Sequence, residues 1–170
     1  MIKILKPKRE DYPEIVSLVN NADKVFLSIY SKEELKYIKI GHENVENLIA
    51  CEKKRKYLIV KEGAEIVAFA SFRLKNEQTV WISSLYVKKN KQKNGYGSIL
   101  IKRIEFLAKR MKAIVVALET SKKASWAVNF YLKNTYRIIK RPTLKTFPFD
   151  KILEKPPVTN RYIFAKEIRK

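Results

Sequence analysis

The chain has 170 residues and 46% hydrophobic residues, which suits one globular domain with its own core. Its 37 Lys and Arg residues against 17 Asp and Glu residues give a formal net charge of +20, concentrated in the second half. Cys51 and His42 each stand alone, which excludes a disulfide framework and a multi-cysteine zinc site. No apolar run reaches the ~20 residues of a membrane span, and the first residues lack the apolar centre of a signal peptide. We therefore expect a cytoplasmic protein without a membrane partner.

The first third of the chain predicts one short strand and three helical regions. Ile2–Leu5 alternates like a strand, and the helix after it has an apolar stripe through Ile15, Leu18 and Val19. Ser31 and Glu34 have capping-box spacing, which predicts a second helical region to about residue 37. A third helix is predicted from about residue 44 to residue 53.

From residue 57 the apolar period becomes that of strands. Residues 57–60 and 65–72 flank a turn and predict a hairpin, and residues 79–87 predict a third strand. Helices are predicted at 96–111 and about 123–134. Strands are predicted at 113–118, which is apolar throughout and therefore buried, and at about 136–140 and 160–165. Four prolines make 142–158 a predicted loop. This order predicts a mixed α/β sheet in a single domain, 1–170.

Two of the four glycines, Gly95 and Gly97, lie between a predicted strand and a predicted helix. Free amides at a helix N-terminus attract anions, and glycine removes the Cβ atoms that would hold a phosphate away. The segment therefore indicates a pyrophosphate-binding site. The alternative is a plain tight turn without a ligand. Neither the P-loop pattern nor the dinucleotide-binding pattern of three glycines fits. The preceding loop adds positive charge through Lys88, Lys89, Lys91 and Lys93.

Gln92-Lys93-Asn94-Gly95-Tyr96-Gly97 matches the Q/R-x-x-G-x-G/A signature of the GNAT superfamily, the acyl-CoA-dependent N-acyltransferases. Leu85-Tyr86-Val87 resembles the Leu-Tyr-Val strand end of that family, and residues 127–134 resemble its A-x-x-F-Y-x-K-x segment. The resemblance implies a GNAT-like mixed, splayed, mostly antiparallel sheet of about six to seven strands with helices on both faces. It also implies a bulge at Ser83-Ser84 and acetyl-CoA, without a metal, in a V-shaped cleft.

Carried over position by position, the resemblance gives each motif residue a role. The backbone of the strand end would pair with the pantetheine arm, and the amides of 93–98 would hold the pyrophosphate, with Gln92 beside them. Tyr131 would be the general acid that protonates the departing CoA thiolate, since a phenol stays protonated at neutral pH. From its helical stripe alone, Tyr131 is equally a packing residue. The predicted cofactor-binding residues are Leu85, Tyr86, Val87, Gln92, Lys93, Asn94, Gly95, Tyr96, Gly97 and Ser98.

The sequence departs from the family pattern at three places. Ala124 stands where the family often has Asn, and Thr135-Tyr136 replaces Gly-Phe, which makes the turn there less permissive. Residues 79–87 lack the carboxylate that some members use as a general base. Glu119 is the nearest candidate base, with an ion pair as its alternative role. Tyr30, Tyr37, Trp81 and Trp126 are candidates for an acceptor pocket, although aromatic residues mostly build cores.

Three functions follow from these patterns. The leading hypothesis is acetyl transfer from acetyl-CoA to a primary amine of a small molecule or peptide, by direct attack in a ternary complex of a monomer or homodimer. The basic second half leaves a nucleic-acid partner open, with an RNA-borne amine such as aminoacyl-tRNA as the acceptor. The phosphates of CoA explain the basic loop without nucleic acid. The third function is a module that binds acyl-CoA or nucleic acid without catalysis.

Overall fold

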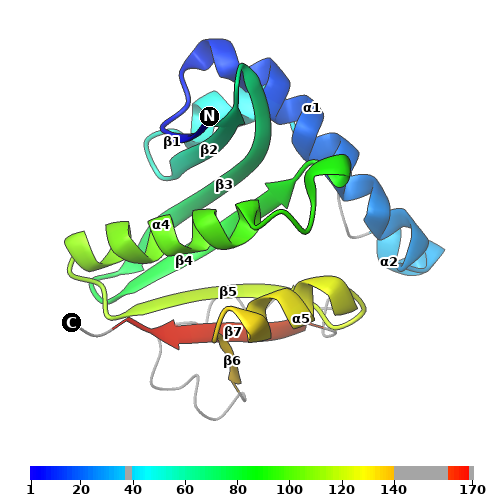
Figure 1. Ribbon diagram of the computed structural model, residues 1–170. Coiled ribbons are helices and arrows are strands. Elements are labelled where there is room, and N and C mark those ends of the chain that lie inside the picture. The colour runs from blue at the N-terminus through cyan, green and yellow to red at the C-terminus, as the bar shows by residue number, and fades with distance from the viewer. Residues whose placement is uncertain (37–39, 140–160, 169–170) are drawn as a thin grey trace.

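The computed structural model describes residues 1–36, 40–139 and 161–168 (Figure 1). The helices in this part are α1 (Tyr12–Asp23), α2 (Lys32–Leu35), α3 (Val45–Cys51), α4 (Tyr96–Arg110) and α5 (Ser125–Lys133), with the 3-10 helices η1 (Arg9–Asp11), η2 (Lys24–Ser28) and η3 (Lys89–Lys91). The strands are β1 (Ile2–Leu5), β2 (Lys56–Glu62), β3 (Glu65–Asn76), β4 (Thr79–Val87), β5 (Val115–Ser121), β6 (Arg137–Ile139) and β7 (Arg161–Glu167).

The strands of the described residues form one sheet of seven, in the order β1-β2-β3-β4-β5-β7-β6. Neighbouring strands are antiparallel except β4 and β5, which are parallel. The predicted mixed and mostly antiparallel sheet is therefore confirmed, as is the capping box at the start of α2. The predicted loop at 142–158 lies outside the described residues.

The sheet opens between β4 and β5. The two strands pair only where residues 79–81 meet 115–117, and beyond this point they separate (Figure 1). Ser83 is the extra residue of a β-bulge, because Ser84 and Ile82 pair with consecutive residues of β3. The bulge expected at this position is confirmed, and the splayed ends of β4 and β5 follow it.

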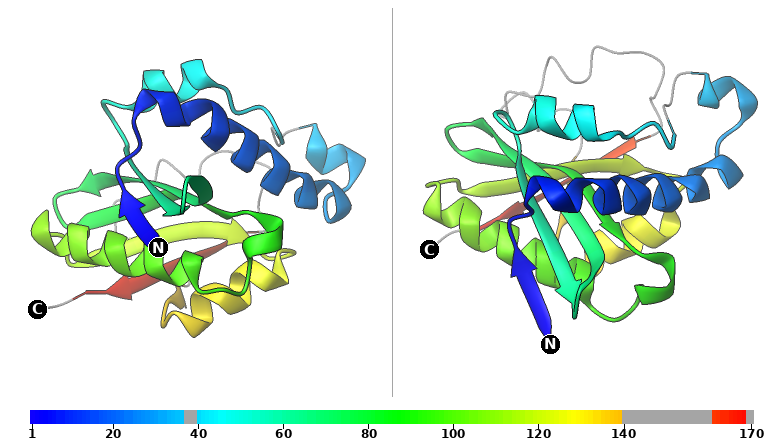
Figure 2. Two further views of the ribbon diagram at one scale, coloured as in Figure 1. Left: turned by 45° about the horizontal axis from the view of Figure 1, so that its top comes forward. Right: turned by 90° about the horizontal axis from the view of Figure 1, so that it is seen from above.

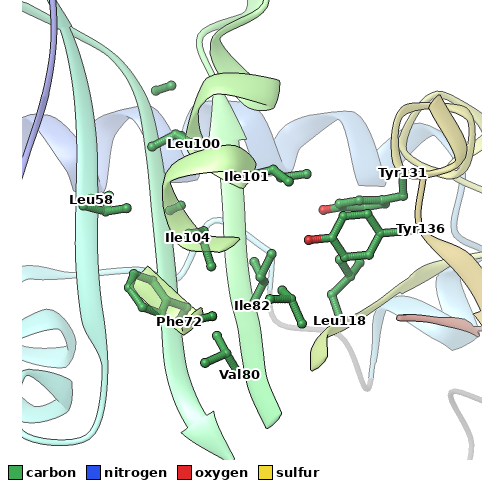
Figure 3. Close-up of a cluster of buried hydrophobic side chains, with 14 of the residues drawn as sticks. Leu58, Phe72, Val80, Ile82, Leu100, Ile101, Ile104, Leu118, Tyr131 and Tyr136 are labelled. Carbon is green, nitrogen blue, oxygen red and sulfur yellow. The ribbon is translucent and has the colours of Figure 1, made fainter. Parts of the chain in front are cut away.

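Helices cover both faces of the sheet (Figure 2). On one face α4 and α5 enclose the largest cluster of buried side chains, which includes Phe72, Ile104 and Leu118 (Figure 3). On the other face α1 and α3 pack against β2 and β3, where Ile15 and Phe69 lie in a second buried cluster. The opening between β4 and β5 therefore joins two faces that carry different helices.

Several elements differ from the prediction at their ends; β3, for example, continues to Asn76 and not to residue 72. β5 begins at Val115 and not at Ala113, because Ala113 closes the turn that ends α4. The N–H of Ala113 donates to the carbonyl of Ala108 at 3.0 Å, and Lys112 takes a φ of 62°, the left-handed helix ending that usually has glycine. The helical turn η2, which continues α1, was not predicted.

Candidate active site

The edge of β4 that faces the opening carries backbone groups that pair with no described strand. The N–H of Lys88 donates to the carbonyl of Val67 at 2.9 Å, so Lys88 directs its backbone groups toward β3. Because backbone directions alternate along an antiparallel strand, the N–H and C=O groups of Val87 and Leu85 point away from β3. No described strand pairs with β4 on that side beyond Trp81. This free edge fits an extended amide chain such as pantetheine.

The N-terminus of α4 lies at the end of the same strand and loop. Gly95 is its N-cap residue, with a φ of 84°, and Lys93 in the loop has a φ of 66°. No side chain caps the helix, and its first turn contains no acidic residue. The first amides of a helix have no intrahelical acceptor, and left-handed turns gather such amides into a concave anion site. The predicted segment through Ser98 therefore has the geometry that a pyrophosphate needs.

The two glycines of the signature serve different purposes. An added Cβ at Gly95 would meet no atom within 4 Å, so its left-handed backbone is the reason for glycine there. An added Cβ at Gly97 would lie 2.9 Å from Cζ of Phe130 and 3.7 Å from a methyl carbon of Leu85. Gly97 therefore lets α4 approach α5, a contact that the sequence interpretation did not include.

Two of the four loop lysines are held in ion pairs. The ammonium group of Lys88 lies 3.2 and 2.9 Å from carboxylates of α1 and β3, and that of Lys91 contacts Glu62 of β2. These pairs fix the loop to the sheet and use up the charge that was expected to attract phosphates. Lys89 and Lys93 are exposed, and within the described parts of the chain neither takes part in an ion pair.

The other side chains of the signature build the loop. Nε2 of the exposed Gln92 donates to the carbonyl of Val87 at 3.4 Å, and Nδ2 of Asn94 donates to the carbonyl of Lys91 at 3.3 Å. The side chain of Tyr96 is buried in the core beneath α4. At these positions the backbone amides, and not the side chains, are the groups left for a ligand.

Tyr131 packs in the core with its phenol in the protonated form. Its ring is buried, with ring centroids of Phe130, Phe164 and Tyr136 at 5.1, 5.5 and 6.0 Å. Burial raises the pKa of Tyr131, so the phenol stays protonated at neutral pH. Figure 3 shows the hydroxyls of Tyr131 and Tyr136 directed toward Ile101 and Ile82. No described residue accepts a hydrogen bond from the hydroxyl of Tyr131.

The departure at Thr135-Tyr136 keeps the helix ending of the family. The N–H of Tyr136 donates to the carbonyl of Tyr131 at 3.1 Å and that of Thr135 to the carbonyl of Leu132 at 2.9 Å, which is a Schellman motif. Thr135 takes the left-handed conformation, with a φ of 66°. Tyr136 is buried and its hydroxyl contacts Glu105 at 3.1 Å. The motif therefore survives without glycine.

The candidate base Glu119 forms an ion pair, with its carboxylate 2.7 Å from the guanidinium of Arg161. A carboxyl group that the sequence did not indicate lies closer to β4. Asp23, at the end of α1, is half-buried, and burial raises its pKa against the effect of hydrogen bonds from Tyr86 and the backbone of Gly41. A single carboxylate at a helix end belongs to no recognisable sequence pattern. Its function depends on the strand that the fold places beside it.

Aromatic rings connect the end of α1 to α5. Phe26 of η2 stacks with Tyr30 at 5.9 Å between centroids and lies 6.2 Å from Trp126 of α5. Lys123 and Glu34 add an ion pair of 2.7 Å across the same junction. Tyr30 and Trp126 therefore both lie beside Phe26, and their place in an acceptor pocket stays a prediction. Trp81 lies in a separate buried cluster, and residue 37 lies outside the described residues.

The part of the chain that the structure describes contains neither a metal-binding cluster nor a membrane-spanning helix. No group of three or more His, Cys, Asp or Glu side chains there is placed to hold a metal ion. No helix there is long and apolar enough to cross a membrane.

The sequence profile of the acetyltransferase (GNAT) family matches residues 19–136, more than two thirds of the chain. The match contains β4, α4 and α5, the elements that form the opening and the helix N-terminus described above. The chain therefore belongs to the acetyltransferase (GNAT) family and is an acetyltransferase of the class that uses acetyl-CoA.

Solved structures of this family share the whole fold. PaiA N-acetyltransferase from Thermoplasma acidophilum, in complex with coenzyme A, has a TM-score of 0.73 and 16% identity, over 98% of this chain and 99% of that chain. A GNAT acetyltransferase from Staphylococcus aureus has a TM-score of 0.73 and 18% identity, over 99% and 100%. One from Elizabethkingia anophelis with acetyl-CoA bound has a TM-score of 0.65 and 20% identity, over 98% and 97%. No curated protein gives a significant sequence match.

Proposed function

We propose that this protein transfers the acetyl group of acetyl-CoA to a primary amine by direct attack in a ternary complex, with Tyr131 as the general acid. One observation carries the proposal. A protonated phenol, with no hydrogen-bond acceptor among the described residues, is held on α5 beside the opening between β4 and β5. Across that opening runs the free backbone edge of β4, which is where the acetyl donor would lie.

The donor would be held mainly by backbone groups. The N–H and C=O groups of Leu85 and Val87 would hydrogen-bond the amides of pantetheine as a neighbouring strand does. The amides at 93–98 and the end of α4 would bind the pyrophosphate, with Lys89 and Lys93 as the exposed cations nearby. The coenzyme A and acetyl-CoA held by two of the structural relatives support this choice of donor.

The chemistry needs one proton donor at the sulfur. A neutral amine attacks the thioester carbonyl, so that a C–N bond forms and the C–S bond breaks. Tyr131 gives its phenolic proton to the departing sulfur, and the phenolate recovers a proton from the newly acylated nitrogen. The CoA thiolate, whose thiol has a pKa near 8.5, is a weaker base than the phenolate of buried Tyr131, so the phenolate readily takes up the proton of the acylated nitrogen and returns to its starting state.

The proposal is tested by Tyr131→Phe, which keeps the packing and removes the proton. Thiol release from acetyl-CoA is measured with polyamines, amino acids, peptides and aminoacyl-tRNA as acceptors. Loss of a general acid lowers kcat by about 10²–10⁴-fold, while the Kd of acetyl-CoA stays unchanged by calorimetry. Tyr136→Phe is the matched control, because it removes a hydroxyl from the adjacent buried ring and should leave transfer intact. Wild-type turnover by Tyr131→Phe would refute the assignment.

A second candidate acceptor, an amine carried by RNA, is favoured by the outer face of α4. The exposed ring of Phe106 lies between the guanidinium groups of Arg103 and Arg110, at 5.2 and 5.9 Å from its centroid. Aromatic and basic side chains together are typical of single-stranded nucleic-acid sites. Retention of the protein on RNA at 0.2 M salt, lost in Phe106→Ala, would support this acceptor, and no retention would exclude it.

A further inference from the structure

We infer that Asp23 receives the acceptor: its carboxylate binds the ammonium form of the amine and takes a proton from it before attack. The inference rests on the proposed function and extends it to the deprotonation step, for which the sequence offered only Glu119. It is an acceptor-binding and general-base role for a residue outside every recognised motif.

The position of Asp23 relative to β4 is the first argument. Asp23 ends α1, and a hydrogen bond joins its carboxylate to the side chain of Tyr86 on β4. Tyr86 packs on the face of the sheet covered by α1 and α3, whereas its neighbours Leu85 and Val87 pack on the face covered by α4 and α5. Asp23 thus lies beside the strand segment that would hold the donor, on the face opposite the cluster that contains Tyr131.

Tyr86 is half-buried near both Asp23 and Tyr131. Burial raises the pKa of its phenol most, and the neighbouring Asp23, Glu43 and Tyr131 raise it further. The attacking nitrogen and the departing sulfur are on different sides of the reacting carbonyl, so a base and an acid on opposite faces of the opening suit the reaction. Asp23 on α1 and Tyr131 on α5, with Tyr86 of β4 near both, provide this arrangement.

Asp23 also has no cationic partner among the described residues. Three other half-buried carboxylates have cationic partners, with Glu52, Glu105 and Glu119 lying 2.9, 2.9 and 2.7 Å from a cationic nitrogen. Within the described ranges, no Lys or Arg side chain forms an ion pair with Asp23, although the chain carries a net charge of +20. The adjacent Lys24 instead donates to the side chain of Asn21 at 2.9 Å. A substrate ammonium would supply the missing positive charge.

Glu43 strengthens the attraction at the same place. Asn20 of α1 fixes its backbone through two hydrogen bonds of 2.9 Å, one to the carbonyl and one from the N–H. Glu43 also forms no ion pair with a described Lys or Arg side chain, and it acts on Tyr86. Asp23 and Glu43, two carboxylates without a described cationic partner, therefore both lie near the phenol of Tyr86, which favours a cationic ligand over a neutral or anionic one.

The surroundings of Asp23 also suit a proton acceptor. Burial raises the pKa of its carboxyl, and the hydrogen bonds from Tyr86 and Gly41 lower it by a smaller amount. A base is most effective when its pKa lies near the working pH, because it can then both take and release the proton. Tyr86 and the backbone of Gly41 are the groups that hydrogen-bond the carboxylate of Asp23, and no described cation lowers its pKa.

The proton transfers balance. The ammonium group gives one proton to Asp23, and the neutral nitrogen then forms its bond to the acetyl carbon as the bond to sulfur breaks. Tyr131 protonates the sulfur and recovers a proton from the acylated nitrogen. Asp23 finally releases its proton to water, so the net products are the acetylated amine, the thiol of CoA and one proton.

The experiment compares Asp23→Asn with Glu46→Gln, a carboxylate-to-amide control at an exposed position of α3. The acceptor is whichever of spermidine, free lysine, an N-terminal peptide amine or aminoacyl-tRNA the wild-type protein acetylates. Asp23→Asn should lower kcat/KM about 10²-fold at pH 7, and the deficit should shrink as the pH approaches the pKa of the amine, about 10 for lysine. A purely structural role would lower the rate equally at every pH.

Two controls keep the result decisive. The Tm of Asp23→Asn should equal or exceed that of the wild type, since the substitution removes an unpaired half-buried charge, and the Kd of acetyl-CoA should not change. Wild-type acetyl transfer with an unchanged kcat/KM and pH profile in Asp23→Asn would overturn this inference alone. No transfer to any of the four amines by the wild type would overturn the proposed function and this inference with it.

Discussion

The turn after α5 offers a test in which a substitution should stabilise the protein. Thr135 holds the left-handed position of the Schellman motif with a φ of 66°, and its Oγ1 donates to the carbonyl of Asn134 at 2.6 Å. A β-branched residue is strained in this region of backbone space, where glycine is not. Thr135→Gly should therefore relieve strain at a position that fixes the helix carrying Tyr131.

The magnitude follows from three opposing effects. The left-handed conformation costs an L-residue about 1–2 kcal/mol. Glycine gives back about 0.5–1 kcal/mol through the greater entropy of the unfolded chain, and the lost hydroxyl hydrogen bond is exposed and small. The net gain is at most about 1 kcal/mol, and a gain of that size raises the Tm of a domain of this length by about 2–4 °C.

The assay is thermal and urea unfolding, with acetyl transfer measured on the same samples. Thr120→Gly is the matched control, because Thr120 lies in β5 without a positive φ and its replacement should lower the Tm. Catalysis should be unchanged in Thr135→Gly, since Tyr136 stays buried and keeps its hydrogen bond to the carbonyl of Tyr131. A lower Tm would refute the reasoning that Thr135 is strained. A lower kcat at a higher Tm would show that the Thr135 side chain also contributes to catalysis.

Three further outcomes follow from the described contacts. Gly95→Ala, at a φ of 84°, should cost about 1 kcal/mol of stability and weaken acetyl-CoA binding in calorimetry. Gly97→Ala would place its Cβ 2.9 Å from Phe130, so acetyl transfer should fall and be restored by adding Phe130→Leu; no rescue would contradict the contact. Burial acts to raise the pKa of Asp11, but its hydrogen bonds, the strongest from Lys61, outweigh it and lower the pKa. The stabilisation is then present above about pH 4 and lost on acidification, so the unfolding free energies of wild type and Asp11→Asn should converge between pH 6 and pH 3.

The order of helices and strands was predictable because the spacing of apolar residues within each segment indicates its secondary structure. The continuous apolar run that became β5 and the alternating strands β2 and β3 are recognisable from neighbouring residues alone. The signature from Gln92 to Gly97 likewise identifies a strand, a loop and a helix N-terminus that are contiguous in sequence. What these patterns could not supply is contact between distant segments.

The candidate site depends on such contacts. Gly97 was interpreted as space for a phosphate, and its steric neighbour is Phe130, more than thirty residues later. Lys88 was counted as free charge, but β3 and α1 bring carboxylates to it. Asp23 has no motif at all, and only the fold places it beside Tyr86. The sequence gives the chemical type of each side chain, but it does not give the distant residue that contacts the side chain and thereby determines its role.

Although the chain has a net charge of +20, the charged groups differ between the two faces of the opening. The face of α4 presents amides, exposed lysines and Phe106 with its two arginines, all suited to an anion such as CoA. The face of α1 presents Asp23 and Glu43 without cations from the described residues, which suits an ammonium group. A polyanion on α4 would occupy the face proposed for the donor, and the acceptor position proposed beside Asp23 and Glu43 would repel it. This opposition of charge favours a small cationic amine or a peptide amine over an RNA-borne amine as the acceptor.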